Sequence, residues 1–328
     1  MSKKHHGGTQ TAVTTMNTIG ATAQKYQNYF FVIPVVSSLL AIAALLMWNL
    51  HAGIDLKGGS LLEVRYPEGR PDQAALQTKV DTLGFGEVRI QPSNTAEYVL
   101  RQRDLTNAEK NTLTEAVNSF GKAEEVQFNS VGPSIGAELM QKAWYAIVMI
   151  TLLTIAFIAW AFRGVSEPVA SWKYGVVAII TLLHDILIPT GLFAYLGHVR
   201  GAEVGALFIV ALLTILGISI NDTIVVFDRI RENLNLNIDA NHKQESFGAV
   251  VWRSIMQTLT RSINTSVTVM VMLAALFWYG PVSTQDFSLT LIVGMLAGTY
   301  SSILVASPLL ILIEKRQKSK PAVTAKGK

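Results

Sequence analysis

The chain has 328 residues, of which 50% are hydrophobic and only 15% are charged, and its formal net charge is +4. This balance excludes an ordinary soluble globular protein and indicates a membrane protein. The chain contains no cysteine, which excludes disulfides and thiolate metal sites.

Six apolar segments are long enough, or nearly so, to cross a bilayer as helices, which takes about 20 residues. They lie at 30–50, 143–162, 174–196, 205–227, 263–279 and 287–313. We therefore expect an α-helical polytopic membrane protein with six transmembrane helices. The first helix is 30–50, and the region 143–313 holds the other five.

Lysine and arginine gather on one side of the expected membrane. They lie within the tails 1–29 and 314–328 and within a loop at about 228–262. The two short loops on the opposite side hold only Arg200. Positively charged loops stay in the cytoplasm, so both termini are expected there and residues 51–142 outside. The basic balance requires no nucleic-acid partner.

The external region 51–142 has the pattern of a small α+β domain. Alternating or helical apolar spacing indicates strand, helix, strand, strand, helix and strand at 60–66, 72–83, 86–91, 97–101, 106–120 and 125–130. This order predicts a ferredoxin-like domain. No catalytic or nucleotide signature is present, so we interpret it as a binding or levering module.

Asp222 is the first candidate for function because it lies inside the apolar segment 205–227. An ionised carboxylate at membrane depth costs several kcal/mol and usually marks a proton or ion pathway. Ser219 is one turn earlier on the same helical face, and Asn221 and Thr223 flank Asp222, so these side chains offer hydrogen bonds for a chain of waters or carboxyl groups. The alternative is an acid that only holds neighbouring helices together.

Two further charged residues are candidates for a proton pathway. Arg261 is expected to begin a helix whose polar stripe, including Thr265, faces Asp222; alternatively, Arg261 extends to the lipid headgroups. Asp185, beside His184, lies near the middle of its span. It is either a relay element or an interhelical hydrogen-bonding group.

Several small residues are expected to serve packing. Gly294 and Gly298 give one helix face on which a neighbour approaches closely. Gly58 and Gly59 are turn formers, so Asp55 beside them is expected to shape the turn from the membrane into the first strand.

Four stretches carry a family resemblance: Gly-Ile-Asp-Leu-Lys-Gly-Gly at 53–59, then 131–136, 219–233 and 298–302. They resemble the SecD/SecF family, the accessory subunits of the bacterial Sec protein translocase. The resemblance runs from about 29 to 314. Six spans with one modest external insertion are similar to SecF rather than to SecD.

The resemblance implies a protein-export subunit of the bacterial cytoplasmic membrane, not an enzyme, which pairs with SecD and works with the Sec channel complex on exported polypeptides. Its energy source would be the proton gradient, with no cofactor. Asp222 matches the family's transmembrane aspartate and Arg261 the basic residue beside it. Membrane lipids are also expected to contact the protein.

Two other functions are open. One is a proton-coupled exporter of small amphiphiles from the same resistance-nodulation-division superfamily, although such exporters generally need larger external domains. The other is an intramembrane aspartyl protease using Asp185 and Asp222, although its Gly-x-Gly-Asp motif is missing.

The expected cytoplasmic loop at about 228–262 alternates acids and bases and then places Phe247, Val250 and Ile255 at near-helical spacing. This pattern is typical of a helix that lies on the membrane surface. A docking site for the translocase channel is the alternative.

Overall fold

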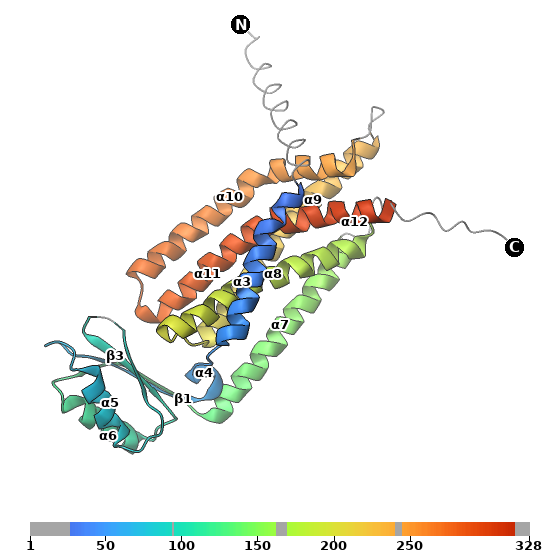
Figure 1. The fold of residues 1–328 in the computed structure, drawn as a ribbon. Coiled ribbons are helices and arrows are strands. Elements are labelled where there is room, and N and C mark those ends of the chain that lie inside the picture. Colours follow the sequence, from blue (N-terminus) through green and yellow to red (C-terminus); the bar gives the residue numbers. More distant parts are fainter. Residues whose placement is uncertain (1–26, 94, 162–168, 240–244, 319–328) are drawn as a thin grey trace, which may run out of the picture.

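A computed structural model describes residues 27–93, 95–161, 169–239 and 245–318. Most of the expected tails 1–29 and 314–328 therefore lies outside the described residues, namely 1–26 and 319–328. Long helices form one bundle, and a small sheet domain lies at one end of it (Figure 1).

Five helical segments in the described part of the chain are long and apolar enough to cross a membrane. They are α7 Pro133–Ala161, α8 Ser171–Arg200, α9 Ala206–Asp239, α10 Phe247–Tyr279, and α11 Val282–Ser301 continued by the π-helical turn η1 Ser302–Ala306 and by α12 Ser307–Lys318. A shorter apolar helix, α3 Val32–Trp48, follows the single turn α2 Gln27–Phe30. Seventeen residues of α-helix measure about 25 Å, somewhat less than a bilayer core of about 30 Å.

The helices of the bundle differ in how much apolar surface they expose. Helix α3 packs closely on α8, where a Cβ added to Gly191 would lie 2.4 Å from Cα of Ala41. Helix α7 instead exposes most of its apolar side chains, including Trp144, Leu152 and Trp160. Such a surface suits contact with lipid tails and not with water.

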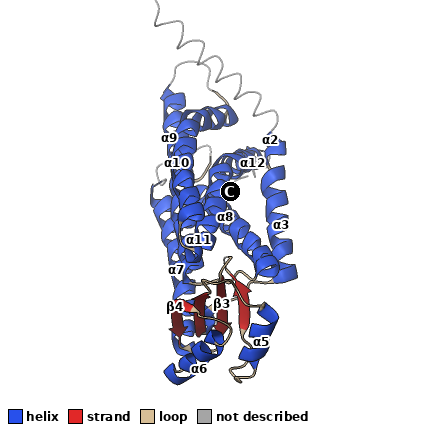
Figure 2. Cartoon of the chain, turned by 90° about the vertical axis from the view of Figure 1, so that its left-hand side faces the viewer, coloured by secondary structure: helices blue, strands red, loops and turns tan. Residues whose placement is uncertain are grey.

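The region between α3 and α7 forms a four-stranded antiparallel sheet with two helices. Its elements are β1 Gly59–Arg65, α5 Gln73–Asp81, β2 Arg89–Pro92, β3 Glu97–Gln102, α6 Asn107–Asn118 and β4 Glu124–Val131, and the strand order is β2-β3-β1-β4. The expected β-α-β-β-α-β order is therefore present. Fully buried leucines fill the core between sheet and helices. Figure 2 shows the strands nearer to the helical bundle and α6 on the far side.

Helix α6 begins with the capping box that its sequence predicts. The Thr106 hydroxyl accepts from the Glu109 backbone N–H, and the Glu109 carboxylate accepts from the Thr106 backbone. A hydrogen bond from Arg103, together with the bonds from Thr106, lowers the pKa of Glu109 to about 2. Local sequence chemistry therefore determines where α6 begins.

The prediction that a helix within 228–262 lies on the membrane surface is wrong. Helix α9 continues to Asp239 and α10 already begins at Phe247, so the two helices form a packed hairpin. The side chains of Val250 and Ile255 are 0% exposed because they pack in one core with Phe227 of α9. The apolar stripe that suggested a lipid surface is covered by a neighbouring helix instead.

The turn into the sheet domain is tightly enclosed. Gly58 has φ 81° and Gly59 has φ 143°, both in the region that favours glycine. A Cβ at Gly58 would lie 2.6 Å from Cα of Pro133, the first residue of α7. The turn therefore requires glycine both for its backbone angles and for its contact with α7.

We predict that Gly58→Ala lowers the stability of the full chain more than Gly86→Ala. Gly86 has a similar φ of 83°, but nothing lies within 4 Å of its added Cβ. Both variants lose about 1–2 kcal/mol through backbone strain, and Gly58→Ala loses about 1–3 kcal/mol more through overpacking. Thermal unfolding of the purified chain in detergent measures the difference. Equal losses would show that the contact with α7 is unimportant.

Candidate functional site

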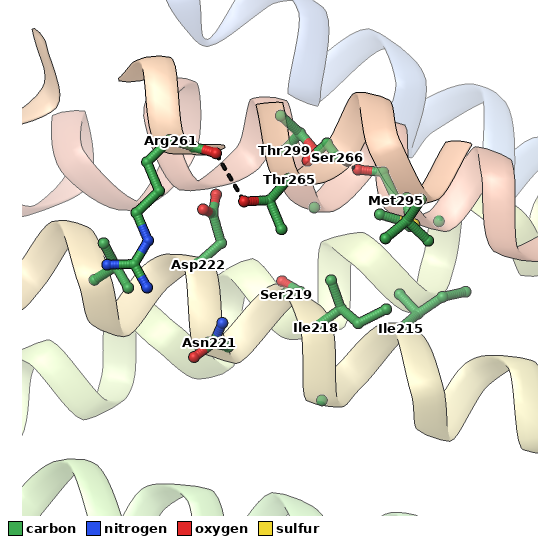
Figure 3. A pocket seen from close by; sticks show the side chains of 15 residues that line it. Ile215, Ile218, Ser219, Asn221, Asp222, Arg261, Thr265, Ser266, Met295 and Thr299 are labelled. Atoms are coloured by element: carbon green, nitrogen blue, oxygen red, sulfur yellow. Dashed lines mark hydrogen bonds between the residues drawn. The ribbon is translucent and has the colours of Figure 1, made fainter. Parts of the chain in front are cut away.

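Helices α9, α10 and α11 enclose a cavity of about 340 Å³ within the bundle. Asp222 and Arg261 both line it, from α9 and α10 respectively (Figure 3). The rest of the lining is mostly apolar or uncharged, including Ile215, Ile218, Ser219, Asn221, Thr265, Ser266, Met295 and Thr299. An acid and a base therefore share one cavity inside an otherwise apolar bundle.

The Asp222 carboxylate is held by one serine hydroxyl on each oxygen. Ser262 of α10 donates to Oδ1, and Ser302 of η1 donates to Oδ2 at 2.7 Å. Both serines are buried, whereas the Asp222 residue is partly exposed beside the cavity. The carboxylate thus has fixed donors on one side and an accessible space on the other.

Arg261 lies in the middle of α10 and does not begin a helix, because α10 starts fourteen residues earlier at Phe247. Figure 3 shows its side chain reaching from α10 toward α9 beside Asp222. Among the ion pairs recorded between described residues, none joins Arg261 to Asp222. The two groups share the cavity without a direct ion pair.

Asp185 forms a second polar centre on α8, and its side chain is 0% exposed. Its carboxylate accepts hydrogen bonds from Ser219 of α9 and from Ser301 of α11, the latter at 2.9 Å. His184 Nδ1 lies 2.9 Å from its other oxygen. The Ser219 hydroxyl thus bonds to Asp185 and not to Asp222, because the rotation of α9 in the bundle directs Ser219 toward α8.

Three consecutive residues at the end of α11 contact the polar groups of both centres. The Tyr300 hydroxyl lies 3.0 Å from His184 Nε2, Ser301 bonds to Asp185, and Ser302 bonds to Asp222. The α-helix changes to a π-helical turn at this point. Such turns often occur at functional sites, because the inserted residue changes which side chains face a neighbouring helix.

Sequence analysis missed the roles of Tyr300, Ser301 and Ser302. The only sequence signal is the pair of adjacent serines that continues the small helix face of Gly298. Gly294 also belongs to this face, and a Cβ at Gly298 would lie 3.2 Å from Cβ of Ser219. The close packing of α11 on α9 brings the serines within reach of both carboxylates.

Asp55 lies away from the cavity. Its carboxylate accepts a hydrogen bond of 2.9 Å from the backbone N–H of Ala206, at the beginning of α9. Asp55 belongs to the four-residue helix α4 Ile54–Lys57, which leads into Gly58 and Gly59. The structure therefore separates Asp55 from Asp185 and Asp222, which are grouped in the bundle.

The arrangement is suited to holding and moving protons. Carboxyl groups accept and release protons, and serine hydroxyls donate to the ionised form and accept from the protonated one. The two carboxylates are not joined by any hydrogen bond recorded between described residues; each has its own serine donors. Adjacent residues of α11 and η1 nevertheless connect the surroundings of the two centres.

Comparison with known proteins gives a consistent result. Residues 110–316 match the family described as protein export membrane protein SecD/SecF, C-terminal. Protein translocase subunit SecF of Thermobaculum terrenum is 38% identical, with 89% of this chain and 93% of that protein covered. The SecF subunit of Anaerolinea thermophila is 36% identical, with 87% and 91% covered.

A solved structure agrees with these relatives. The crystal structure of SecDF from Thermus thermophilus, a translocon-associated membrane protein, matches with a TM-score of 0.76 and 32% identity. The match covers 89% of this chain but only 38% of the SecDF chain, so the present chain corresponds to a minor part of that protein.

We predict that Ser301→Ala lowers the stability of the chain by about 1–3 kcal/mol, because it removes a donor from the buried Asp185 carboxylate. Ser288→Ala is the matched control: Ser288 is also 0% exposed on α11, but it donates to the Thr284 carbonyl of its own helix. Thermal unfolding of both variants in detergent measures the effect. If the two variants unfold at the same temperature, the bond to Asp185 contributes nothing specific.

Proposed function

Because this chain belongs to the SecF family of protein translocase subunits, we propose that it uses the proton gradient, together with SecD, to promote protein export through the Sec channel complex. The SecF relatives are translocase subunits, and the chain is accordingly an accessory transport component without an enzymatic reaction. The observation that carries the proton-coupling proposal is a partly exposed aspartate, Asp222, beside a cavity in an apolar bundle.

Asp222 is the proposed proton carrier because of its surroundings. It combines two fixed serine donors with an accessible cavity, whereas Asp185 is completely enclosed. Arg261 lines the same cavity and is positioned to neutralise Asp222 when its carboxyl group loses the proton. One charge that crosses 100 mV releases about 2.3 kcal/mol, enough to shift a conformational equilibrium substantially.

SecD is the proposed partner on the open side of the cavity. Three polar residues that line the cavity are exposed, although they lie on helices apolar enough to span a membrane: Asn221, Arg261 and Thr265. Polar groups facing lipid are costly, so a protein surface is expected to cover them. The matching SecDF chain is much longer than this chain, which agrees with a second subunit filling the role of its remainder.

The proposed topology has six spans in the bacterial cytoplasmic membrane. The apolar helix α3 serves as the first span, and both termini are in the cytoplasm, which places residues 51–142 outside. The element order and the strand order β2-β3-β1-β4 support a ferredoxin-like domain there. Exported polypeptides are the substrates on this side, and lipids surround exposed helices such as α7.

The two alternatives have less support. A protease would need its two aspartates to share one site, whereas Asp185 and Asp222 each bond to different serines. An exporter of small amphiphiles uses similar proton chemistry, but the named relatives are protein translocase subunits.

We predict that Asp222→Asn abolishes proton-driven export at a normal membrane level of the protein, because the amide keeps the shape of the side chain but cannot carry a proton. Asp228→Asn is the matched control, since Asp228 lies further along α9, is exposed and pairs with Arg231. Secretion of a reporter is measured in cells that lack the native protein and carry each variant.

Equal secretion by the wild type and Asp222→Asn would contradict the proposal and reduce Asp222 to a packing role. Loss of secretion in Asp228→Asn as well would show that the assay responds to any lost charge on α9.

A further inference from the structure

The chain enters the external domain beside the loop that connects α8 to α9. The Gly53 N–H donates to the Val204 carbonyl at 2.9 Å, and the Val204 N–H donates to the His51 carbonyl at 2.7 Å. These bonds form a parallel bridge between Ala52 and Val204. The segment that leads into the sheet domain is therefore fixed by its backbone to the segment that leads into α9.

Asp55 adds a side-chain bond at the same place. Ala206 is the first residue of α9, and its N–H has no partner within the helix. The Asp55 carboxylate accepts from this N–H, and a carboxylate at a helix N-terminus is also favoured by the helix dipole. A Cβ at Gly205 would lie 2.7 Å from Asp55 Oδ2, so glycine leaves room for this approach.

The sheet also holds the same loop. Arg101 of β3 forms an ion pair of 3.3 Å with Glu203, whose side chain is only 9% exposed. Arg101 also donates to Gln91 of β2, and Gln91 lies directly against Gly201. Residues 201–206 are thus held between the root of the external domain and the open face of its sheet.

The helix that begins at this joint carries Asp222. Ala206 and Asp222 are separated by about 24 Å along α9, at 1.5 Å per residue. Ser219, which binds Asp185, lies on the same continuous helix. A displacement of the start of α9 therefore moves side chains of both polar centres.

We propose that Asp55 is the positioning residue that couples the external domain to α9, so that movement of the domain and the protonation of Asp222 occur together. Asp55 acts as a hydrogen-bond acceptor in this joint and carries no proton. The proposal rests on the proton-driven function proposed above, because it specifies how that site acts on the external domain.

The test uses this chain and its SecD partner reconstituted together in liposomes with the Sec channel. Export of a polypeptide is measured under an imposed proton gradient, and proton flux is measured separately in the same vesicles. Asp55→Ala is expected to reduce export at least about fivefold, which corresponds to the usual loss of an N-terminal cap, while proton flux stays within about twofold. Asp55→Asn keeps an acceptor and is expected to retain more than about half of the export.

Asp72→Ala is the matched control. Asp72 caps α5 in the external domain by accepting from the Ala75 N–H at 3.0 Å, and it plays no part in the joint. Export by this variant is expected to stay within about twofold of the wild type. If Asp55→Ala does not accumulate, Glu203→Gln weakens the joint from the sheet side and is expected to reduce export with unchanged proton flux.

Three results would overturn the proposal: full export by Asp55→Ala, equal loss in Asp55→Asn and Asp55→Ala, or a parallel loss of export and proton flux. Full export by Asp55→Ala would show that Asp55 does not couple the domain to α9. Equal loss in both variants would show that the charge matters and not the hydrogen-bond acceptor. A parallel loss of export and proton flux would show that Asp55 acts in folding alone. Asp222→Asn, measured in parallel, tests the proton-driven function separately, because unchanged proton flux in this variant contradicts that function whatever the Asp55 variants show.

Discussion

Two carboxylates inside the helical bundle, one buried and one partly exposed, need hydrogen-bond donors, and this need governs how the helices pack. A carboxylate in an apolar interior is stable only when other polar groups surround it. Asp185 and Asp222 obtain these groups from serines on three different helices, Ser219, Ser262, Ser301 and Ser302. The glycines of α11 bring the serines within reach, and the π-helical turn directs adjacent residues to different carboxylates. The packing of the helices and the hydrogen bonding of the two carboxylates therefore depend on each other.

Helix α9 connects the sheet domain to this arrangement of carboxylates. The root and the sheet of this domain both hold residues 201–206, and α9 extends from there to Asp222 without a break. A long helix is stiff, because shortening or bending it requires breaking backbone hydrogen bonds. Helix α9 consequently links the surroundings of Asp222 directly to residues 201–206 and to the sheet domain.

The sequence was sufficient for features that depend on local pattern. Apolar length predicted the long helices, and alternation predicted the sheet domain. The charge cost of a membrane carboxylate makes Asp222 a candidate, and its role in proton transfer stays a prediction. The rotation of a helix within the bundle could not be predicted from the sequence. Ser219 lies one turn before Asp222 on α9, yet its hydroxyl bonds to Asp185. The partner of Asp55 is 151 residues away, and no spacing rule reaches so far. The start of α10 was misplaced because an apolar stripe looks the same whether lipid or another helix covers it.

In the proposed function, the Asp222 carboxyl group gains and loses a proton while the protein works. Infrared difference spectroscopy of the reconstituted assembly, recorded between acidic and alkaline buffer, detects the carbonyl band of a protonated carboxyl group directly. The account predicts a band in the wild type that Asp222→Asn removes and that Asp55→Asn leaves in place. A wild-type band that persists unchanged in Asp222→Asn would contradict the account, because another group would then carry the proton.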